Sequence, residues 1–267
     1  MQNDSTTKMI IVTLGVCLVC AVIVSGLAVG LRPRQVRNQE LDKLSNILQA
    51  GQLYEPGIDL QKVFKERIET LVINLNTGEP VPEDEYRQVV ESRTLDVKTM
   101  AGNPRLAQTI PDSEDIADLN KQPKYMPVYA VQSGDSIGRY IFPIYGRGLW
   151  STMYGFLALD GDLRTIRGIT YYDHGETPGL GGEVDNPSWK EQWEGKLAFG
   201  PDRNVRIQVI KGTVDPSDPN SQYKIDGLSG ATITTRGVNN TVRFWLGRAG
   251  YLPFIENQRK DGTNETS

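Results

Sequence analysis

The sequence predicts an α+β protein in which a single N-terminal transmembrane helix is followed by a soluble domain with a mixed or antiparallel sheet flanked by helices. Three features support this fold class. Residues 9–31 form an uncharged apolar run, and from Val128 onward short strand-like runs are separated by turn residues. After Thr232, apolar residues recur at three- and four-residue steps, which is the spacing of one buried helix face. Strands with helices around them are typical of α+β domains.

Length and composition indicate a folded protein with a substantial core. The chain has 267 residues, of which 38% are hydrophobic and 23% are charged, and this composition is unlike that of a disordered protein. A net charge of −4 and an isoelectric point near 5.2 argue against the basic surface that nucleic acids require, so we expect no nucleic-acid partner.

The uncharged run at residues 9–31 predicts one membrane-spanning helix after a short tail, residues 1–8. About 23 residues in a helix measure roughly 34 Å, which is enough to cross the ~30 Å hydrocarbon core of a bilayer. The alternative is a cleaved signal peptide with Ala28-Val29-Gly30 as its cleavage site, although the apolar region of such peptides usually has only ~7–15 residues. We therefore expect the lipid bilayer to surround this segment.

Both cysteines of the chain, Cys17 and Cys20, lie inside this apolar run. In a lipid-facing helix we expect them to act as small apolar side chains. The soluble part then has neither a disulfide nor a thiolate-bound iron–sulfur cluster. One lysine precedes the helix, whereas three arginines follow it, so the positive-inside rule alone would place the soluble domain in the cytoplasm (Arg32, Arg34 and Arg37).

Residues 32–127 are predicted to form the N-terminal part of the soluble region. Apolar residues between 41 and 48 recur at helical spacing up to Gly51, a natural helix end. Asp59 can cap a second helix, and residues 71–75 have the pattern of a strand. The prolines and acids that follow predict irregular connections.

Residues 128–252 are predicted to form a second part, a domain of short strands and helices, and residues 253–267 a C-terminal tail. Asp160-Gly161-Asp162 is a plausible hairpin connection, because Asp-Gly tolerates positive φ. Ser188-Trp189-Lys190-Glu191 has the spacing of a capping box and predicts a short helix. The predicted strands are residues 128–131, 140–145, 153–159, 166–172 and 205–210.

Residues 226–234 have the sequence Asp-Gly-Leu-Ser-Gly-Ala-Thr-Ile-Thr and lie at the start of the predicted amphipathic helix. The first amide N–H groups of a helix have no intrahelical partners, and the macrodipole adds roughly half a positive charge, so such a helix start favours a phosphate. Gly230 and Ala231 allow a bulky ligand to approach the backbone. The alternative is that Ser229 or Thr232 only caps the helix, as hydroxyl residues often do.

Two glycine-rich loops are further candidates for a binding site. Residues 146–150, Gly-Arg-Gly-Leu-Trp, join two predicted strands, and residues 174–182, His-Gly-Glu-Thr-Pro-Gly-Leu-Gly-Gly, follow another. A flat cofactor ring needs apolar neighbours and backbone groups for its polar edge, and glycines permit that approach. The alternative is that both are ordinary turns in which Trp150 and Leu180 are core residues.

Other kinds of site find little support in the sequence. Neither loop has the pattern of a Walker A loop or of a dinucleotide-binding fold. His174 is the only histidine, and nothing near it completes a Ser-His-Asp triad or a metal site, so we expect a hydrogen-bonding role at the surface and neither a catalytic residue nor a metal.

Taken together, the motifs Gly-x-Gly-Leu-Trp, His-Gly-Glu-Thr-Pro-Gly-Leu-Gly and Ser-Gly-Ala-Thr-x-Thr, in that order, resemble those of the FMN-binding domains of electron-transport membrane complexes. The resemblance covers roughly residues 140–252. The single N-terminal helix, the segment after it and the ending Trp245-Leu246-Gly247 are most similar to the C subunits of sodium-translocating NADH:quinone oxidoreductases. The G subunits of Rnf-type complexes, which are shorter before the flavin domain, are the second family.

The resemblance implies that FMN is joined by a phosphoester bond to Thr232, the threonine that closes Ser-Gly-Ala-Thr. Ser229, Gly230 and Ala231 would then surround the phosphate. A separate flavin transferase would install the group from FAD, and Asp226 would help that enzyme to position its metal or substrate.

The resemblance also implies contacts to the flavin ring. The candidates are Trp150, Glu176, Thr177, Leu180 and Gly181. For Glu176 the alternative is an ordinary solvated loop acid.

The implied function is an electron relay within a bacterial inner-membrane complex of six subunits that couples NADH oxidation and quinone reduction to sodium translocation. Because flavin transfer in such systems resembles an extracytoplasmic step, the resemblance places the soluble domain in the periplasm, against the arginine count. Two other classes compete with this interpretation. One is a flavin-free scaffold subunit anchored in the membrane, and the other is a self-contained flavin reductase, for which the sequence shows no NADH site.

Overall fold

The computed structural model describes residues 6–87, 97–134 and 136–264. The two predicted tails, residues 1–8 and 253–267, therefore lie partly outside the described residues.

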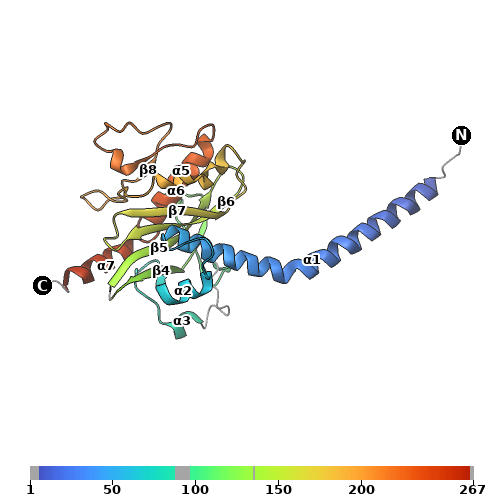
Figure 1. Cartoon of the computed structure of the whole chain (residues 1–267), viewed down its shortest axis with the longest axis horizontal. Helices are drawn as coiled ribbons and strands as arrows, with labels where there is room; N and C mark the ends of the chain where they lie inside the picture. The colour runs from blue at the N-terminus through green and yellow to red at the C-terminus, as the bar shows by residue number, and fades with distance from the viewer. Residues whose placement is uncertain (1–5, 88–96, 135, 265–267) are drawn as a thin grey trace. The chain divides into compact units, whose positions relative to one another are not determined.

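The chain divides into two compact units, Met1–Lys43 and Leu44–Ser267. The predicted fold class is confirmed, because a long apolar N-terminal helix precedes a unit built on an antiparallel sheet with helices (Figure 1). The second unit contains the three motifs on which the predicted site depends.

Helix α1 (Thr6–Ala50) is one continuous helix with Pro33 inside it. The predicted membrane helix and the helical stretch that follows it are thus parts of a single element. Among the described helices, α1 is the one whose length and composition suit a membrane crossing, with a window of mean hydropathy 2.8 that is wholly unburied. Cys17 and Cys20 are free and exposed on it. A signal sequence would meet the same criteria of position and hydropathy.

A five-stranded antiparallel sheet with the order β1-β4-β5-β6-β7 organises the second unit. Strands β4 to β7 follow one another as neighbours, and β1 joins the sheet at the edge beside β4. The predicted hairpin at residues 160–162 connects β6 to β7. The strands are β1 (Ile68–Asn74), β4 (Tyr125–Ser133), β5 (Ser136–Arg147), β6 (Thr152–Asp160) and β7 (Ile166–Asp173).

The remaining elements of this unit are short, apart from two C-terminal helices. The helices are α2 (Leu60–Arg67), α3 (Glu83–Arg87), α4 (Val97–Gly102), α5 (Pro187–Glu191), α6 (Thr232–Trp245) and α7 (Leu252–Asn264), with 3-10 turns at η1 (Gly181–Asp185) and η2 (Ser221–Tyr223). Two small strand pairs complete the unit: β2 (Ala107–Thr109) with β3 (Lys121–Pro123), and β8 (Gln208–Val209) with β9 (Lys224–Ile225).

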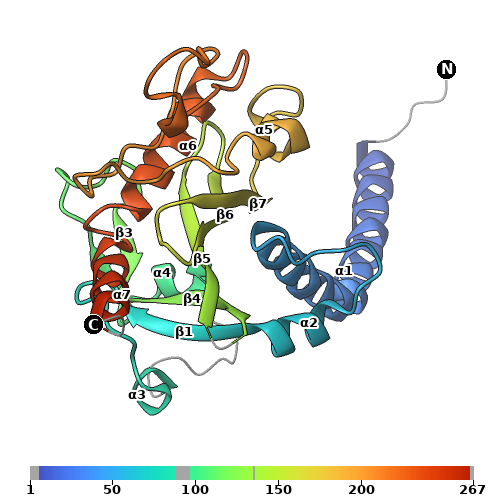
Figure 2. The ribbon, with the colours of Figure 1, turned by 60° about the vertical axis from the view of Figure 1, so that its left-hand side comes forward.

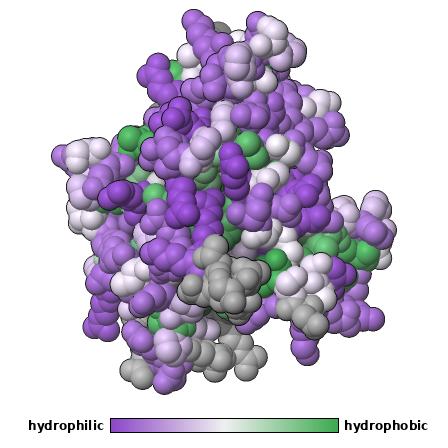
Figure 3. All heavy atoms as spheres, turned by 90° about the vertical axis from the view of Figure 1, so that its left-hand side faces the viewer, coloured by the Kyte–Doolittle hydropathy of each residue, from purple (hydrophilic) through white to green (hydrophobic). Residues whose placement is uncertain are grey.

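Both faces of the main sheet are covered, which explains why its strands are nearly continuous apolar runs. On one face, Ile47 and Leu48 at the end of α1 pack with Phe156, and α2 adds Phe64. On the other face lie α6 and α7 (Figure 2). Their buried apolar residues belong to one cluster with the alternate side chains of the same strands. Asp59 caps α2 as predicted, with its carboxylate accepting from the Lys62 amide. On the side of the molecule seen in Figure 3, the described surface residues are mostly hydrophilic, and the apolar ones form small separate patches.

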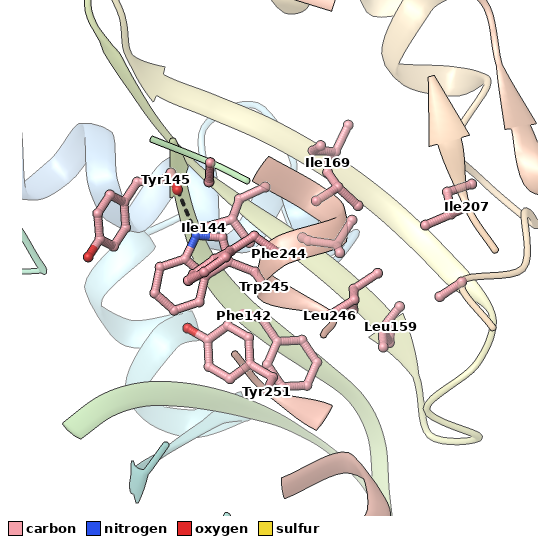
Figure 4. Packing of buried hydrophobic residues seen from close by; sticks show 14 of the residues in the cluster. Phe142, Ile144, Tyr145, Leu159, Ile169, Ile207, Phe244, Trp245, Leu246 and Tyr251 are labelled. Atoms are coloured by element: carbon pink, nitrogen blue, oxygen red, sulfur yellow. Dashed lines mark hydrogen bonds between the residues drawn. The ribbon is translucent and has the colours of Figure 1, made fainter. Parts of the chain in front are cut away.

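Helix α6 is fixed to β5 by buried aromatic side chains (Figure 4). The Trp245 indole Nε1 donates to the Tyr145 carbonyl oxygen at 2.6 Å, and the Tyr251 hydroxyl donates to the Pro143 carbonyl oxygen at 2.7 Å. The rings of Phe142 and Tyr251 have centroids 4.7 Å apart. The Trp245 indole and the Tyr251 hydroxyl thus each have a partner, as burial of Trp and Tyr requires.

Two glycines let α6 approach the end of β5 at backbone distance. A Cβ atom at Gly146 would lie 1.9 Å from Thr241 Oγ1, and one at Gly237 would lie 2.4 Å from the Arg147 carbonyl oxygen. No side chain fits in either space. The N-terminal half of α6 is therefore held against the β5–β6 loop.

The prediction of a strand over residues 205–210 is wrong in length. Only Gln208–Val209 forms a strand, and it pairs in parallel with Lys224–Ile225. The alternation of apolar residues instead buries Ile207 and Val209 in the core without a longer ladder.

The short helix predicted to open at Ser188 begins earlier. Asn186 is its cap, with Oδ1 accepting from the Ser188 amide at 3.0 Å, and Pro187 occupies the first turn. Asparagine caps as well as serine does, and proline suits a first turn because it has no N–H group that needs a partner there. The region expected to be irregular contains regular elements, namely α4 and the β2–β3 pair. Met100 in α4 and Leu106, which precedes β2, are buried.

The close approach of α6 to the sheet gives the first prediction. Gly237→Ala should destabilise the fold by about 1–3 kcal/mol, because its Cβ would overlap the Arg147 carbonyl. Gly102→Ala is the matched control, since a Cβ there has nothing within 4 Å, and it should be neutral or stabilising by up to ~1 kcal/mol. Denaturant unfolding of the detergent-solubilised chain, followed by tryptophan fluorescence, measures both. Equal stability of the two variants would contradict the contact.

Candidate functional site

The three sequence motifs meet at the start of α6, where Glu176 joins them. Its carboxylate accepts from the Leu149 amide at 3.2 Å, from the Trp150 amide at 3.0 Å and from the Thr234 hydroxyl. One side chain therefore connects the β5–β6 loop, the loop after β7 and the first turn of α6. Thr234 was not among the predicted site residues, because it lies 58 positions from Glu176 and no local pattern links the two.

Glu176 is only 5% exposed, so the alternative of a solvated loop acid is wrong. Burial raises the pKa of its carboxyl, but hydrogen bonds from Thr234 and from the amides of Trp150, Leu149 and Ser151 outweigh burial and hold that pKa below its ordinary value. The buried group is therefore a carboxylate at neutral pH.

Two of the motif glycines make room for this carboxylate. A Cβ at Gly148 would lie 2.5 Å from Glu176 Oε1, and one at Gly181 would lie 2.8 Å from Glu176 Oε2. Both glycines are buried. Glycine at these two positions is thus explained by the acid that they face, and a side chain at either would displace it.

Three threonines lie in the first turn of α6, and they differ in exposure. Thr234 and Thr235 are 1% and 6% exposed, whereas Thr232 is exposed. The Thr234 hydroxyl donates to Glu176, and Thr235 Oγ1 accepts from the Leu228 amide at 3.0 Å. Of the three hydroxyls, that of Thr232 is the one that a reagent can reach from solvent.

The start of α6 has no side-chain cap. Ala231 occupies the cap position, and the helix begins at Thr232, so the alternative that Ser229 or Thr232 caps the helix is wrong. Ser229 and Gly230 are exposed beside it, and Gly230 has a φ of +71°, which glycine adopts without strain. The unpartnered N–H groups of the first turn fit a phosphate group.

Apolar side chains are exposed around this helix start. Trp150 is 65% exposed, Leu180 43% and Ile233 54%, so the alternative that Trp150 and Leu180 are core residues is wrong. The Trp150 indole Nε1 donates to Thr177 Oγ1 at 3.1 Å, which fixes the orientation of the ring. Leu180 lies over Gly230, where an added Cβ would be 2.9 Å from Leu180 Cδ2. Such apolar exposure beside polar groups is typical of a binding surface.

Asp226 belongs to the frame that leads into α6. Its Oδ1 accepts from the Val214 amide at 2.7 Å, and its carbonyl oxygen accepts from the Trp189 indole at 2.9 Å. Its amide donates to Gln192 Oε1 at 3.1 Å. The segment before the helix is thus tied to α5 and to the loop that contains Val214.

His174 supports the loop that carries Glu176. Its Nε2 lies 2.8 Å from Asp185 Oδ2, and its Nδ1 accepts from the Glu176 amide at 3.2 Å. The hydrogen bond to Asp185 raises the pKa of His174, although partial burial lowers it. Within the described ranges, no three His, Cys, Asp or Glu side chains come together as metal ligands.

Comparison with protein families gives a match over the region that contains this site. Residues 148–247 match the FMN-binding domain family. The match begins in the β5–β6 loop and ends just after α6, so it includes Glu176, Thr232 and Thr234.

Known proteins of similar sequence extend the match to nearly the whole chain. The C subunit of the Na⁺-translocating NADH-quinone reductase of Pseudomonas aeruginosa is 43% identical over 262 residues, which cover 97% of this chain and 98% of that protein. The corresponding C subunit of Vibrio vulnificus is 40% identical over 263 residues, with 98% and 99% covered.

Comparison with solved structures points to the same family as the sequence comparison. The crystal structure of NqrC from Shewanella oneidensis has a TM-score of 0.73 at 31% identity and covers 82% of this chain and 97% of its own. The C subunit of the Na⁺-translocating NADH-quinone reductase of Parabacteroides distasonis has a TM-score of 0.61 at 27% identity, with 83% and 96% covered. With 40–43% identity over nearly its full length, the chain belongs to the family of C subunits of Na⁺-translocating NADH-quinone reductases.

Proposed function

We propose that this chain is an electron-carrying flavoprotein subunit of a membrane complex that couples NADH oxidation and quinone reduction to sodium translocation, and that its FMN is covalently bound to Thr232. The observation that carries the proposal is the exposed Thr232 hydroxyl at an uncapped helix start, beside the exposed Trp150 and Leu180. Membership of the family of C subunits supports the choice of complex.

The attachment uses groups of the first turn of α6. Thr232 Oγ1 supplies the ester oxygen, and the N–H groups of the turn hold the phosphate oxygens, as they do for anions at other helix starts. Ser229, Gly230 and Ala231 form the approach to the phosphate. When bound, FMN supplies one-electron chemistry that no side chain of this site offers.

The ring lies against the exposed apolar side chains. Trp150, oriented by Thr177, offers a flat face, and Leu180 offers a second apolar contact. Thr177 and the backbone of Gly181 would contact the edge of the ring. The carboxylate oxygens of Glu176 accept hydrogen bonds from backbone amides and from Thr234. Glu176 therefore lies beneath this exposed surface.

Maturation and assembly require other proteins. A flavin transferase attaches the FMN group from FAD to Thr232 Oγ1. The pyrophosphate bond of FAD breaks, AMP leaves and the hydroxyl proton is released, and Asp226 helps that enzyme to position its metal or substrate. The bond between the Asp226 carboxylate and the Val214 amide keeps this part of the motif in one conformation. The finished protein, anchored by α1, joins the other members of a bacterial inner-membrane complex of six subunits.

Thr232→Ala should abolish covalent flavin and leave stability within about 0.5 kcal/mol of wild type, because this exposed residue is not the cap. Thr234→Ala and Thr235→Ala should keep the flavin but lose about 1–3 kcal/mol of stability, since each removes a buried hydrogen bond. Mass spectrometry of the tryptic peptide 225–236, from chains co-expressed with a flavin transferase, detects the FMN increment. Its survival on Thr232→Ala would show that another residue is modified.

Trp150→Ala should leave the attachment intact but shift the absorbance of the flavin and its reduction equilibrium severalfold. Contact with an aromatic ring is worth about 1 kcal/mol, which corresponds to such a factor. Trp150→Phe keeps a flat ring and should retain most of the wild-type behaviour. A flavin with unchanged spectrum and potential on Trp150→Ala would place the ring elsewhere.

The α1 segment should remain uncleaved, with the domain after Arg32 in the periplasm. Flavin transfer outside the cytoplasm motivates this orientation against the charge bias of the three arginines. Protease added to spheroplasts should therefore digest the domain, while a cytoplasmic marker protein stays intact. Protection of the domain until the membrane is lysed would reverse the assignment.

A further inference from the structure

The carboxylate of Glu176 is held by neutral donors alone. Its partners are the amides of Leu149, Trp150 and Ser151 and the hydroxyl of Thr234. Among the residues that the structure describes, no lysine or arginine forms an ion pair with it. A buried carboxylate without a cationic partner is costly unless hydrogen bonds satisfy it, so each of these donors matters.

The two sides of this connection differ in how firmly the rest of the fold holds them. Thr234 belongs to α6, which is anchored by the buried Trp245 and by the contact at Gly237. The Leu149 and Trp150 side chains are exposed on a loop. The carboxylate is therefore the acceptor that ties the Leu149 and Trp150 amides of this loop to the fixed position of α6.

The charge of Glu176 lies directly beneath the exposed surface to which we assigned the ring. Trp150 is bound to it through the backbone amide, and Gly181, which follows Leu180, faces its Oε2 atom. In a buried site of low effective dielectric, a fixed negative charge opposes the arrival of an electron nearby.

We propose that Glu176 is a positioning residue of the cofactor site, which holds the Leu149–Trp150 loop against α6 and whose negative charge lowers the reduction potential of the bound flavin. The second part rests on the proposed function, whereas the first concerns the polypeptide alone. The ligand that this arrangement serves is a flat redox-active ring that covers the exposed Trp150 and Leu180 beside the helix start.

Glu176→Gln in the full-length chain tests both parts. In the Thr232→Ala background, which carries no attached flavin, amide hydrogen exchange at Leu149 and Trp150 should accelerate about tenfold or more, because the amide group of glutamine replaces one acceptor oxygen with a donor. In the flavin-loaded chain, the reduction equilibrium should shift about tenfold toward the reduced form, which is about 59 mV for a one-electron couple.

Three further variants separate position from charge. Glu183→Gln makes the same change in the same segment, at a half-buried acid that accepts from Asn186 Nδ2 instead, and both readouts should stay within about twofold of wild type. Thr234→Val removes a donor but keeps the acid, so exchange at Leu149 and Trp150 should accelerate without the tenfold redox shift. Thr234→Ser retains the hydroxyl and should restore wild-type exchange.

Unchanged exchange in Glu176→Gln overturns the positioning role, and an unchanged potential overturns the electrostatic role. Should Glu176→Gln fail to fold, exchange in Thr234→Val decides: acceleration supports the link, and wild-type rates overturn it. The exchange measurement needs no flavin, so its failure leaves the flavin assignment standing. Absence of FMN from peptide 225–236 overturns the proposed function and leaves the exchange result valid.

Discussion

The approach of α6 to the end of β5 at backbone distance is the constraint on which the site depends. Gly146 and Gly237 have no side chains to separate the two elements, and the buried Trp245 fixes the far end of the helix to the carbonyl of Tyr145. Because the helix cannot retreat from the strand, its first turn lies beside the β5–β6 loop. An uncapped helix start and a loop with an exposed tryptophan are thereby brought together.

The site reverses the usual distribution of polar and apolar side chains. An acid, Glu176, is buried, while Trp150 and Leu180 are exposed. Burial of the acid costs free energy that its hydrogen bonds offset, and exposure of the apolar side chains leaves surface that a ligand can cover. Glycines at positions 148 and 181 leave the space that the carboxylate fills. The buried carboxylate of Glu176 thus supports the loop that carries the exposed Trp150.

Helix α1 combines two kinds of surface in one continuous element. Its N-terminal part is apolar on every side, which suits lipid. From Leu44 onward the helix belongs to the second unit, where Ile47, Leu48 and Ala50 are buried against the sheet. The hydrophobicity of the helix thus changes along the sequence, from apolar on every side in its N-terminal part to apolar on one side after Leu44.

Local patterns in the sequence determined the apolar α1, the cap of α2 at Asp59, the strands of the main sheet and the amphipathic α6, because periodicity and capping act within a few residues. The resemblance of the motifs around residues 148, 176 and 232 to those of FMN-binding domains also implied that they belong to one site. The tertiary structure alone decided that Glu176 is buried against Thr234, that Ala231 occupies the cap position, and that only Thr232 among three neighbouring threonines is exposed. These outcomes depend on which surfaces α6 covers when it packs on β5, and contacts between residues 58 positions apart leave no periodic trace in a single sequence.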